Sequence, residues 1–322
     1  MTKLIALLVE DERVFALPAW HRTISLMERR GLLVTHVAVI PAGPNQYGGV
    51  IQKLWYSRVF GVGNALRLAL FSALERKRRV AEPRTWDEMA HAHGLVVRSI
   101  QNPNGAEMQT FLRSSRCDVL HVLAPVTLSP EILDIPGSGV IAHHSSMLPS
   151  CRGLFPYLWG RLRDEPLGQS FEIQARTPQG RTILAQREAH PRVTRSMLSF
   201  QVWAAHRYPE LAVDATQRLL AGRTLAGPPD VEASYCGLPT LRDRLDFEAR
   251  GGRLSTWSDL RLTLSTRNKL AEISPADEDE CPAARDNLHP FPEALPFRVN
   301  ESRAPGKVIS MRTRRQAAAN QS

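Results

Sequence analysis

Two adjacent histidines, His143 and His144, are the residues of this sequence best placed to do chemistry. They end an apolar run that begins at Gly139, and a loop rich in serine, proline and glycine follows them. An imidazole exchanges protons near neutral pH, so a histidine at such a place can act as a general acid or base. Side chains alternate across a strand, which predicts His144 and Ala142 on one face and His143 on the other. One imidazole is then expected to serve a cleft while its neighbour packs beneath a helix.

The segments around these histidines alternate between apolar runs and helix-like stretches over the first 200 residues. Continuous apolar runs are typical of strands buried on both faces, and repeated strand–helix–strand units predict a parallel sheet covered by helices. The predicted fold class is therefore α/β, with a Rossmann-like, mostly parallel sheet, helices on both faces and a small C-terminal extension. Ligands of such sheets bind beyond the carboxyl ends of the strands, where the loop after His144 falls. The expected strands span residues 4–10, 32–40, 94–100, 117–124 and 139–145.

Glycine and proline divide the remaining chain. The stretch 51–74 reads as two helices around a break at Gly61 and Gly63. The GVGNAL segment at this break lacks a third glycine and follows no clear strand, which favours a helix break over a dinucleotide loop. Two separate helices are expected over 196–205 and 212–221.

Composition along the chain suggests three parts. Residues 1–200 are expected to form the Rossmann-type domain, and residues 201–273 a helical or irregular extension. Residues 274–322 are rich in proline and charge and are expected to be disordered. The first apolar run is too short for a signal peptide, and the four cysteines stand far apart without a CxxC pair. We therefore expect a cytoplasmic protein with reduced thiols and no metal site.

The formal charge of +9 comes from two segments of the sequence. Residues 51–80 contain seven Lys and Arg against one acid, and residues 301–322 contain five against one. The rest of the chain is nearly neutral, which disfavours the binding of nucleic acid by the protein as a whole. The pattern leaves open a peripheral contact of residues 51–80 with a membrane surface or an anionic partner.

The loop after His144 resembles the signature loop of the folate-dependent formyltransferases, which reads Asn-x-His-x-Ser-x-Leu-Pro and then Arg-Gly. This family includes methionyl-tRNA, glycinamide ribonucleotide and amino-sugar N-formyltransferases. The segment 168–186, which ends in Ile-Leu-x-Gln, is similar to the family's downstream hairpin. The matching positions of the loop are His144, Ser146, Leu148, Pro149, Arg152, Gly153, Pro156 and Trp159.

The resemblance implies transfer of a formyl group from 10-formyltetrahydrofolate to an amine. In the family, an asparagine and a protonated histidine stabilise the oxyanion, and an aspartate in the hairpin holds the histidine. Here His144 matches the histidine, Ala142 stands at the asparagine position, and Gln179 falls at the aspartate position. The sequence leaves open whether Gln179 orients His144 or Glu172 substitutes as the acid. Ser146 either supplies a hydroxyl group to the site or holds the loop backbone.

The resemblance also implies where the donor and the acceptor bind. The donor is expected against two loops, with Pro125 and Leu128 on one and Met147, Leu148 and Pro149 on the other. Arg152 either meets an anionic substrate or anchors the loop.

Three functions follow as hypotheses from these residues. The first is an N-formyltransferase acting on a small-molecule amine such as an amino sugar or a nucleotide-linked sugar. The second is an inactive binding or regulatory module of the same fold, because Ala142 and Gln179 depart from the family pattern. The third, formylation of methionyl-tRNA, ranks last because residues 200–322 show few alternating strands.

Overall fold

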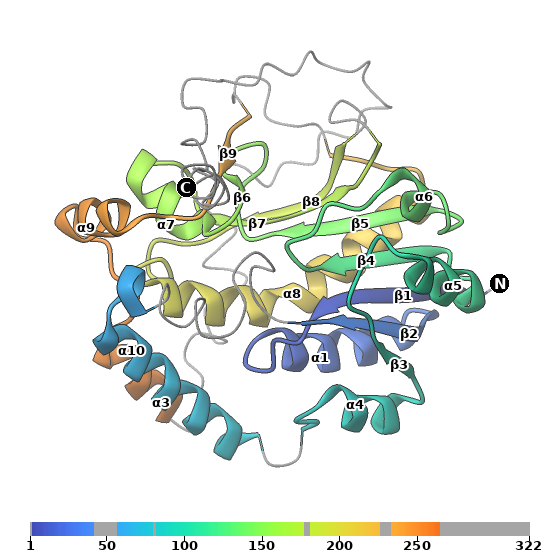
Figure 1. Cartoon of the computed structure of the whole chain (residues 1–322), viewed down its shortest axis with the longest axis horizontal. Coiled ribbons are helices and arrows are strands. Elements are labelled where there is room, and N and C mark those ends of the chain that lie inside the picture. The colour runs from blue at the N-terminus through green and yellow to red at the C-terminus, as the bar shows by residue number, and fades with distance from the viewer. Residues whose placement is uncertain (1, 42–56, 80–81, 177–180, 226–232, 265–322) are drawn as a thin grey trace, which may run out of the picture.

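The computed structural model describes residues 2–41, 57–79, 82–176, 181–225 and 233–264. Its centre is a seven-stranded sheet with the order β3-β2-β1-β4-β5-β7-β8 (Figure 1). The first five strands of this order run parallel, whereas β7 is antiparallel to β5 and β8 is antiparallel to β7. The predicted Rossmann-like, mostly parallel sheet is therefore confirmed. The strands are β1 (Lys3–Glu10), β2 (Leu32–Ile40), β3 (Val96–Ser99), β4 (Val119–Leu123), β5 (Gly139–His144), β7 (Gly168–Ile173) and β8 (Thr182–Glu188).

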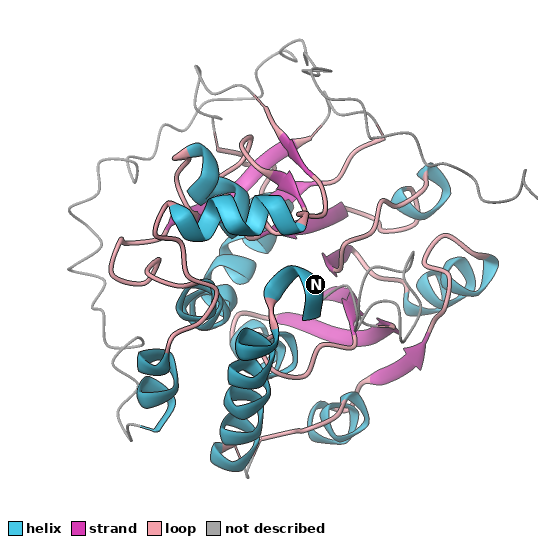
Figure 2. Cartoon of the chain, turned by 60° about the vertical axis from the view of Figure 1, so that its left-hand side comes forward, coloured by secondary structure: helices cyan, strands magenta, loops and turns pink. Residues whose placement is uncertain are grey.

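Helices cover both faces of this sheet (Figure 2). Alternate residues of β1 explain the layers: Ile5 and Leu7 pack in one core cluster with residues of α1 and α8, while Ala6 and Leu8 pack in a second cluster with residues of α5 and α6. Burial of apolar side chains on both faces gives the strand its unbroken apolar sequence. These helices are α1 (Ala16–Glu28), α5 (Ala106–Ser115), α6 (Pro130–Leu133) and α8 (Met197–Leu220), and α4 (Trp86–His93) precedes β3.

Helix α8 is one continuous helix, so the expectation of two helices over this segment was wrong. A capping box between Ser196 and Ser199 starts it, and Pro209 lies inside it. A proline in a helix leaves the carbonyl four residues earlier without its amide partner. Arg22 of α1 donates to this carbonyl, that of Ala205, at 3.2 Å. Burial of Pro209 and its neighbours, together with this bond, keeps the helix intact.

The remaining described elements lie beside the sheet. Gly61, with a φ of +79°, ends a short helical stretch that starts at residue 57 and precedes α3. The expected break is therefore confirmed at Gly61, whereas Gly63 lies inside α3; residues 51–56 lie outside the described part. Helix α8 runs through residue 200, and the division at that residue stays a prediction. The expected disordered tail lies outside the described residues. No helix in the described residues is long and apolar enough to cross a membrane. These elements are α3 (Val62–Arg78), α7 (Pro156–Arg163), α9 (Leu241–Ala249), α10 (Trp257–Leu264) and the two-stranded pair β6 (Arg152–Gly153) and β9 (Tyr235–Cys236).

Candidate active site

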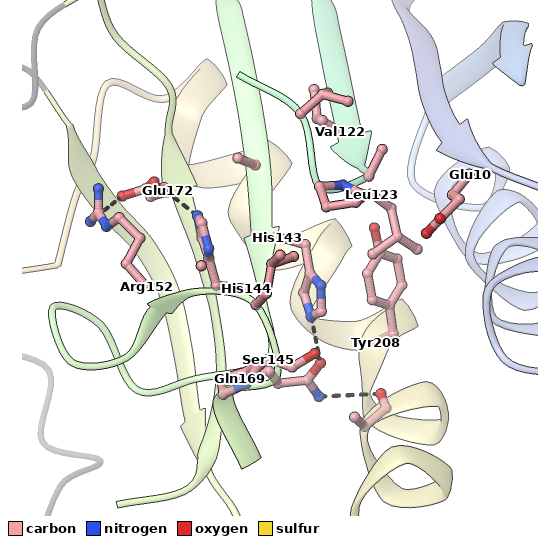
Figure 3. Close-up of a pocket in the computed structure, with 18 of the residues that line it drawn as sticks. Glu10, Val122, Leu123, His143, His144, Ser145, Arg152, Gln169, Glu172 and Tyr208 are labelled. Atoms are coloured by element: carbon pink, nitrogen blue, oxygen red, sulfur yellow. Dashed lines mark hydrogen bonds and ion pairs between the residues drawn. The ribbon is translucent and has the colours of Figure 1, made fainter. Parts of the chain in front are cut away.

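A cleft of about 1150 Å³ opens beyond the carboxyl ends of β1, β4 and β5. Its walls come from the loop after β4, the end of β5, the β7–β8 hairpin, helices α1 and α8, and the segment around β9. This is the edge of an open α/β sheet at which ligands bind. The polar residues that line it and are labelled in Figure 3 are Glu10, His143, His144, Ser145, Arg152, Gln169, Glu172 and Tyr208. Further polar lining residues include Arg163, Glu165, Gln174 and Arg181.

Strand pairing places an acid beside His144. In the β5–β7 pair, Ser170 lies opposite His144 and Glu172 lies opposite Ala142, so Glu172 is on the face of His144. The Nε2 atom of His144 is 2.9 Å from Oε1 of Glu172. Of the two residues that the sequence left open as partners of His144, Glu172 makes the contact. Gln179 lies outside the described residues.

Two arginines keep the Glu172 carboxylate charged. Arg152 Nη2 is 2.7 Å from its Oε2, and Arg181 Nη1 is 3.7 Å from its Oε1. The Glu172 side chain is 2% exposed, and burial alone raises the pKa of such a carboxyl group. The hydrogen bond from His144 and the charges of His144, Arg152 and Arg181 outweigh burial and hold the pKa of Glu172 below its ordinary value. A fixed negative charge therefore stands behind His144 near neutral pH.

Ala142 makes room for this arrangement. It lies directly across the strand pair from Glu172, and residues in such positions have Cβ atoms only about 4.5–5.5 Å apart. A methyl group there leaves the space between the strands to the longer carboxylate side chain. The family's asparagine amide is absent, and the face instead carries an acid with its counter-ions.

His143 points to the opposite face of the sheet, as the strand alternation predicts. Its Nε2 donates to Oε1 of Gln169 at 3.1 Å, and Gln169 in turn donates to the carbonyl of Ala204 in α8. Its ring lies 5.0 Å from the rings of Phe171 and of Tyr208. Burial, reinforced by the positive charge of His144 and only partly opposed by Gln169, lowers the pKa of His143 to about 3. His143 is therefore neutral and structural at neutral pH.

This burial predicts a steep loss of stability in acid. The unfolded chain binds a proton on His143 near pH 6.5, whereas the folded chain binds one only near pH 3. Stability therefore falls as the pH drops between these values, by about 1.4 kcal/mol per pH unit for one such group. Burial likewise lowers the pKa of His121 to about 3. Urea unfolding of His143→Gln across this range should show a slope shallower by one proton, and an unchanged slope would contradict the assignment.

The loop after β5 is held by hydrogen bonds from the hairpin. The Ser170 hydroxyl donates to the carbonyl of Ser146 at 2.6 Å and accepts from the amide of Leu148 at 3.1 Å. Gln186, the glutamine of the Ile-Leu-x-Gln segment, donates to the carbonyl of Leu148 at 2.7 Å. The structure thus joins the two stretches of sequence that carry the family resemblance.

The sequence-predicted site residues are only partly brought together at the cleft. His144, Arg152 and Pro125 line it. Ser146 is 3% exposed, does not line it, and contributes its backbone carbonyl to the loop. The other expected donor-binding residues, Leu128, Met147, Leu148 and Pro149, are not among the lining residues, and Leu128 and Leu148 are buried.

Sequence reasoning missed the segment that fixes Arg152. The amide of Arg152 donates to the carbonyl of Ser234 at 2.9 Å, and the amide of Leu154 donates to that of Cys236 at 2.8 Å. Between them Gly153 has a φ of +114°, and a side chain there would collide with the Cys236 carbonyl. Arg181 and Tyr208 were also missed. Only the pairing of distant segments brings these residues to the cleft, and no local pattern signals it.

Comparison with known proteins gives relatives of one kind. No family model matches the chain. Methionyl-tRNA formyltransferase of Chlorobium limicola is 31% identical over 113 residues, which are 34% of this chain and 36% of that protein. The Synechococcus enzyme of the same name is 26% identical over 243 residues, 69% of this chain and 68% of that protein. The chain spans about a third or less of the length of most curated relatives it matches, such as 25% of the Chromobacterium violaceum protein.

Solved structures with a similar course of the chain also carry formyltransferase names. A sugar N-formyltransferase from Shewanella sp. has a TM-score of 0.46 at 13% identity, over 77% of this chain and 87% of that one. A 4-N formyltransferase from Francisella tularensis has a TM-score of 0.46 at 11% identity, over 76% and 86%. At these TM-scores the fold class rests on the chain's own strand order. Together with the His-x-Ser-x-Leu-Pro loop and the hairpin that holds it, the sequence relatives identify this chain as a relative of the folate-dependent formyltransferases.

Proposed function

We propose that this protein transfers a formyl group from 10-formyltetrahydrofolate to the primary amine of a small molecule that also carries an anionic group, such as an amino sugar phosphate or a nucleotide-linked amino sugar. The observation that carries the proposal is the His144–Glu172 pair on the floor of the cleft, with Arg152 and Arg181 behind the carboxylate. A histidine oriented by a charged carboxylate is a common device for moving a proton during acyl transfer.

His144 would move the proton in this reaction. Its Nε2 is committed to Glu172, and no described residue bonds to its Nδ1. The carboxylate orients the ring and stabilises the imidazolium, so Nδ1 can accept the proton that the attacking amine loses. The protonated ring then provides a positive charge near the developing oxyanion. When the bond from the formyl carbon to the folate nitrogen breaks, the imidazolium would return its proton to that nitrogen. Glu172 acts through His144 and is a positioning residue.

The cleft has unsatisfied polar groups that fit a donor with a flat, polar heterocycle. Arg152 Nε, Arg181 Nε, the amide oxygen of Gln174 and the hydroxyl of Tyr208 are buried and without a hydrogen-bond partner in the described residues. All four residues line the cleft. Buried polar atoms of this kind favour a ligand that completes their hydrogen bonds. Bound there, the folate supplies the formyl group, and Val122, Leu123 and Val126 supply apolar contact.

The arginines of one wall support an anionic group on the acceptor, while three glutamates besides Glu172 (Glu10, Glu12 and Glu165) also line the cleft. Arg152 and Arg181 are only partly neutralised by the one carboxylate of Glu172. Arg163 adds a third guanidinium, 4.0 Å from Glu165 at the same cleft. Guanidinium groups recognise carboxylate and phosphate with high geometric specificity. A phosphate or carboxylate near the amine of the acceptor suits this wall better than a neutral amine does.

The full chain should be assayed with 10-formyltetrahydrofolate and a panel of amino sugars, their nucleotide conjugates and methionyl-tRNA. We expect release of tetrahydrofolate with an anionic sugar amine, and tight binding of a stable formylfolate analogue in calorimetry. Analogue binding without turnover on any acceptor would favour the inactive binding module, which Ala142 already suggests. Turnover with methionyl-tRNA alone would replace the proposed acceptor, and absence of both binding and turnover would reject the proposal.

A further inference from the structure

Helix α3 carries a stripe of exposed apolar side chains on its outer side. Val62 is 75% exposed, Leu66 is 64% exposed, and Leu68 and Leu70 are 44% and 42% exposed. Val62, Leu66 and Leu70 recur every four residues, so they form one stripe along the helix. Alanines 65, 69 and 73 are exposed as well, and they fill the same side of the helix. Figure 1 shows α3 at the periphery beside α10, away from the central sheet.

The inner side of α3 carries an apolar anchor, Phe71, which is 2% exposed and packs with Leu198 and Leu260. Polar contacts surround this anchor. Arg67 donates to Ser255 Oγ at 2.9 Å and to Asn64 Oδ1 at 2.8 Å, and its guanidinium lies 5.8 Å from the centre of the Trp257 ring. Glu75 is 5% exposed and pairs with Arg79 at 2.7 Å. The polar groups of the helix are thus satisfied within the protein. The apolar side chains of its outer stripe stay exposed, and no residue in the described part of the chain covers them. Such a stripe favours contact with a partner outside the molecule.

Positive charge stands at one end of this face. Arg76, Lys77 and Arg78 are exposed in the last turn of α3. None of the exposed residues earlier in the helix carries a charge, because Arg67 is only partly exposed and bonds to Ser255. The helix has one acid, Glu75, and it is buried and paired. An apolar stripe bordered by cations matches the chemistry of an anionic lipid surface, where apolar side chains enter the acyl boundary and cations meet the headgroups.

We infer that the exposed face of α3 docks this protein on an anionic phospholipid bilayer. The helix lies along the surface, with Val62, Leu66 and Leu70 inserted below the headgroups. Arg76 and Lys77 contact phosphate and carboxylate groups of the lipids. Docking involves none of the cleft residues, so it is independent of the proposed formyl transfer.

Co-sedimentation of the full chain with vesicles tests this inference. Binding is expected to mixed phosphatidylcholine–phosphatidylserine vesicles, to be much weaker with pure phosphatidylcholine, and to decrease with salt. The double variant Leu66→Glu/Leu70→Glu should bind at least about tenfold more weakly. Arg76→Gln/Lys77→Gln should lose about fivefold per cation removed, on anionic vesicles only. Leu245→Glu is the matched control: Leu245 is a 50% exposed leucine of α9, and its replacement should change nothing.

Three outcomes would overturn the inference. Failure of the wild-type chain to bind either kind of vesicle is the first. The second is a wild-type chain that binds no lipid but self-associates, with self-association lost in Leu66→Glu/Leu70→Glu. That result would assign the face to a second copy of the chain. The third is a large fall in the Tm of that variant without lipid binding, which would mean that the chain itself covers the face. Retained formyl transfer or cleft binding in all variants is expected and keeps the two proposals distinguishable.

Discussion

Replacing His144 with alanine is expected to lower the kcat of formyl transfer by about 10²–10⁴. The variant removes the imidazole that is proposed to accept the amine proton, while the loop after β5 keeps its hydrogen bonds to Ser170 and Gln186. Affinity for a formylfolate analogue should therefore stay close to that of the wild-type chain. The decrease is to be measured with saturating donor, so that it reports the chemical step rather than binding.

The control for this variant is His91→Ala. His91 is exposed on α4 and lies outside the cleft, so its loss should change neither kcat nor analogue binding. A His144→Ala enzyme with a kcat near that of the wild type would remove His144 from the mechanism. The role would then have to pass to another group of the cleft, such as Ser145.

Replacing Glu172 with glutamine is expected to lower the free energy of unfolding by about 3–5 kcal/mol. The amide has nearly the same volume but no charge, so Arg152 and Arg181 lose the buried anion between them. A buried cation without its partner keeps its desolvation cost and loses the attraction that offset it. Denaturation in urea measures the change, and kcat should also fall, because a neutral side chain no longer stabilises the imidazolium of His144.

The matched control is Asp134→Asn, which removes an acid from the exposed ion pair with Arg176. The side chain of Arg176 is 62% exposed and that of Asp134 is 50% exposed. Such surface pairs contribute about 0–1 kcal/mol to the free energy of unfolding. Similar small losses in both variants would contradict the desolvated charge cluster around Glu172. A large loss in Glu172→Gln alone supports it.

The sheet was predictable because its strands carry their own pattern. The expected strand over residues 32–40 coincides with β2, and the other parallel strands differ from expectation by a few residues at their ends. The two-helix expectation over α8 failed, because no sequence pattern shows that Arg22 satisfies the carbonyl freed by Pro209. Local propensity is a weak prior that such tertiary contacts override.

The site was predictable only where one strand determined it. Alternation along β5 was enough to separate the roles of His143 and His144. The choice between Glu172 and Gln179 depended on the register of β5 against β7, which the sequence does not display. The hydrogen bond between Cys151 and Ser234 joins residues 83 positions apart, and a pair of two-residue strands has no periodicity to detect.

The two ends of the cleft are built by different parts of the fold, because one of them depends on the pairing of β6 with β9. His144 and Glu172, the pair proposed to transfer the proton, belong to the sheet, where any shift of register would disturb the core. The wall that carries Arg152, Ser234 and Tyr235 is instead closed by a short strand outside that sheet. Substitutions around β9 are therefore expected to reshape the proposed acceptor wall, while the hydrogen bond between His144 and Glu172 keeps its place within the sheet. During divergence, a protein built this way is expected to change its acceptor more readily than its chemistry.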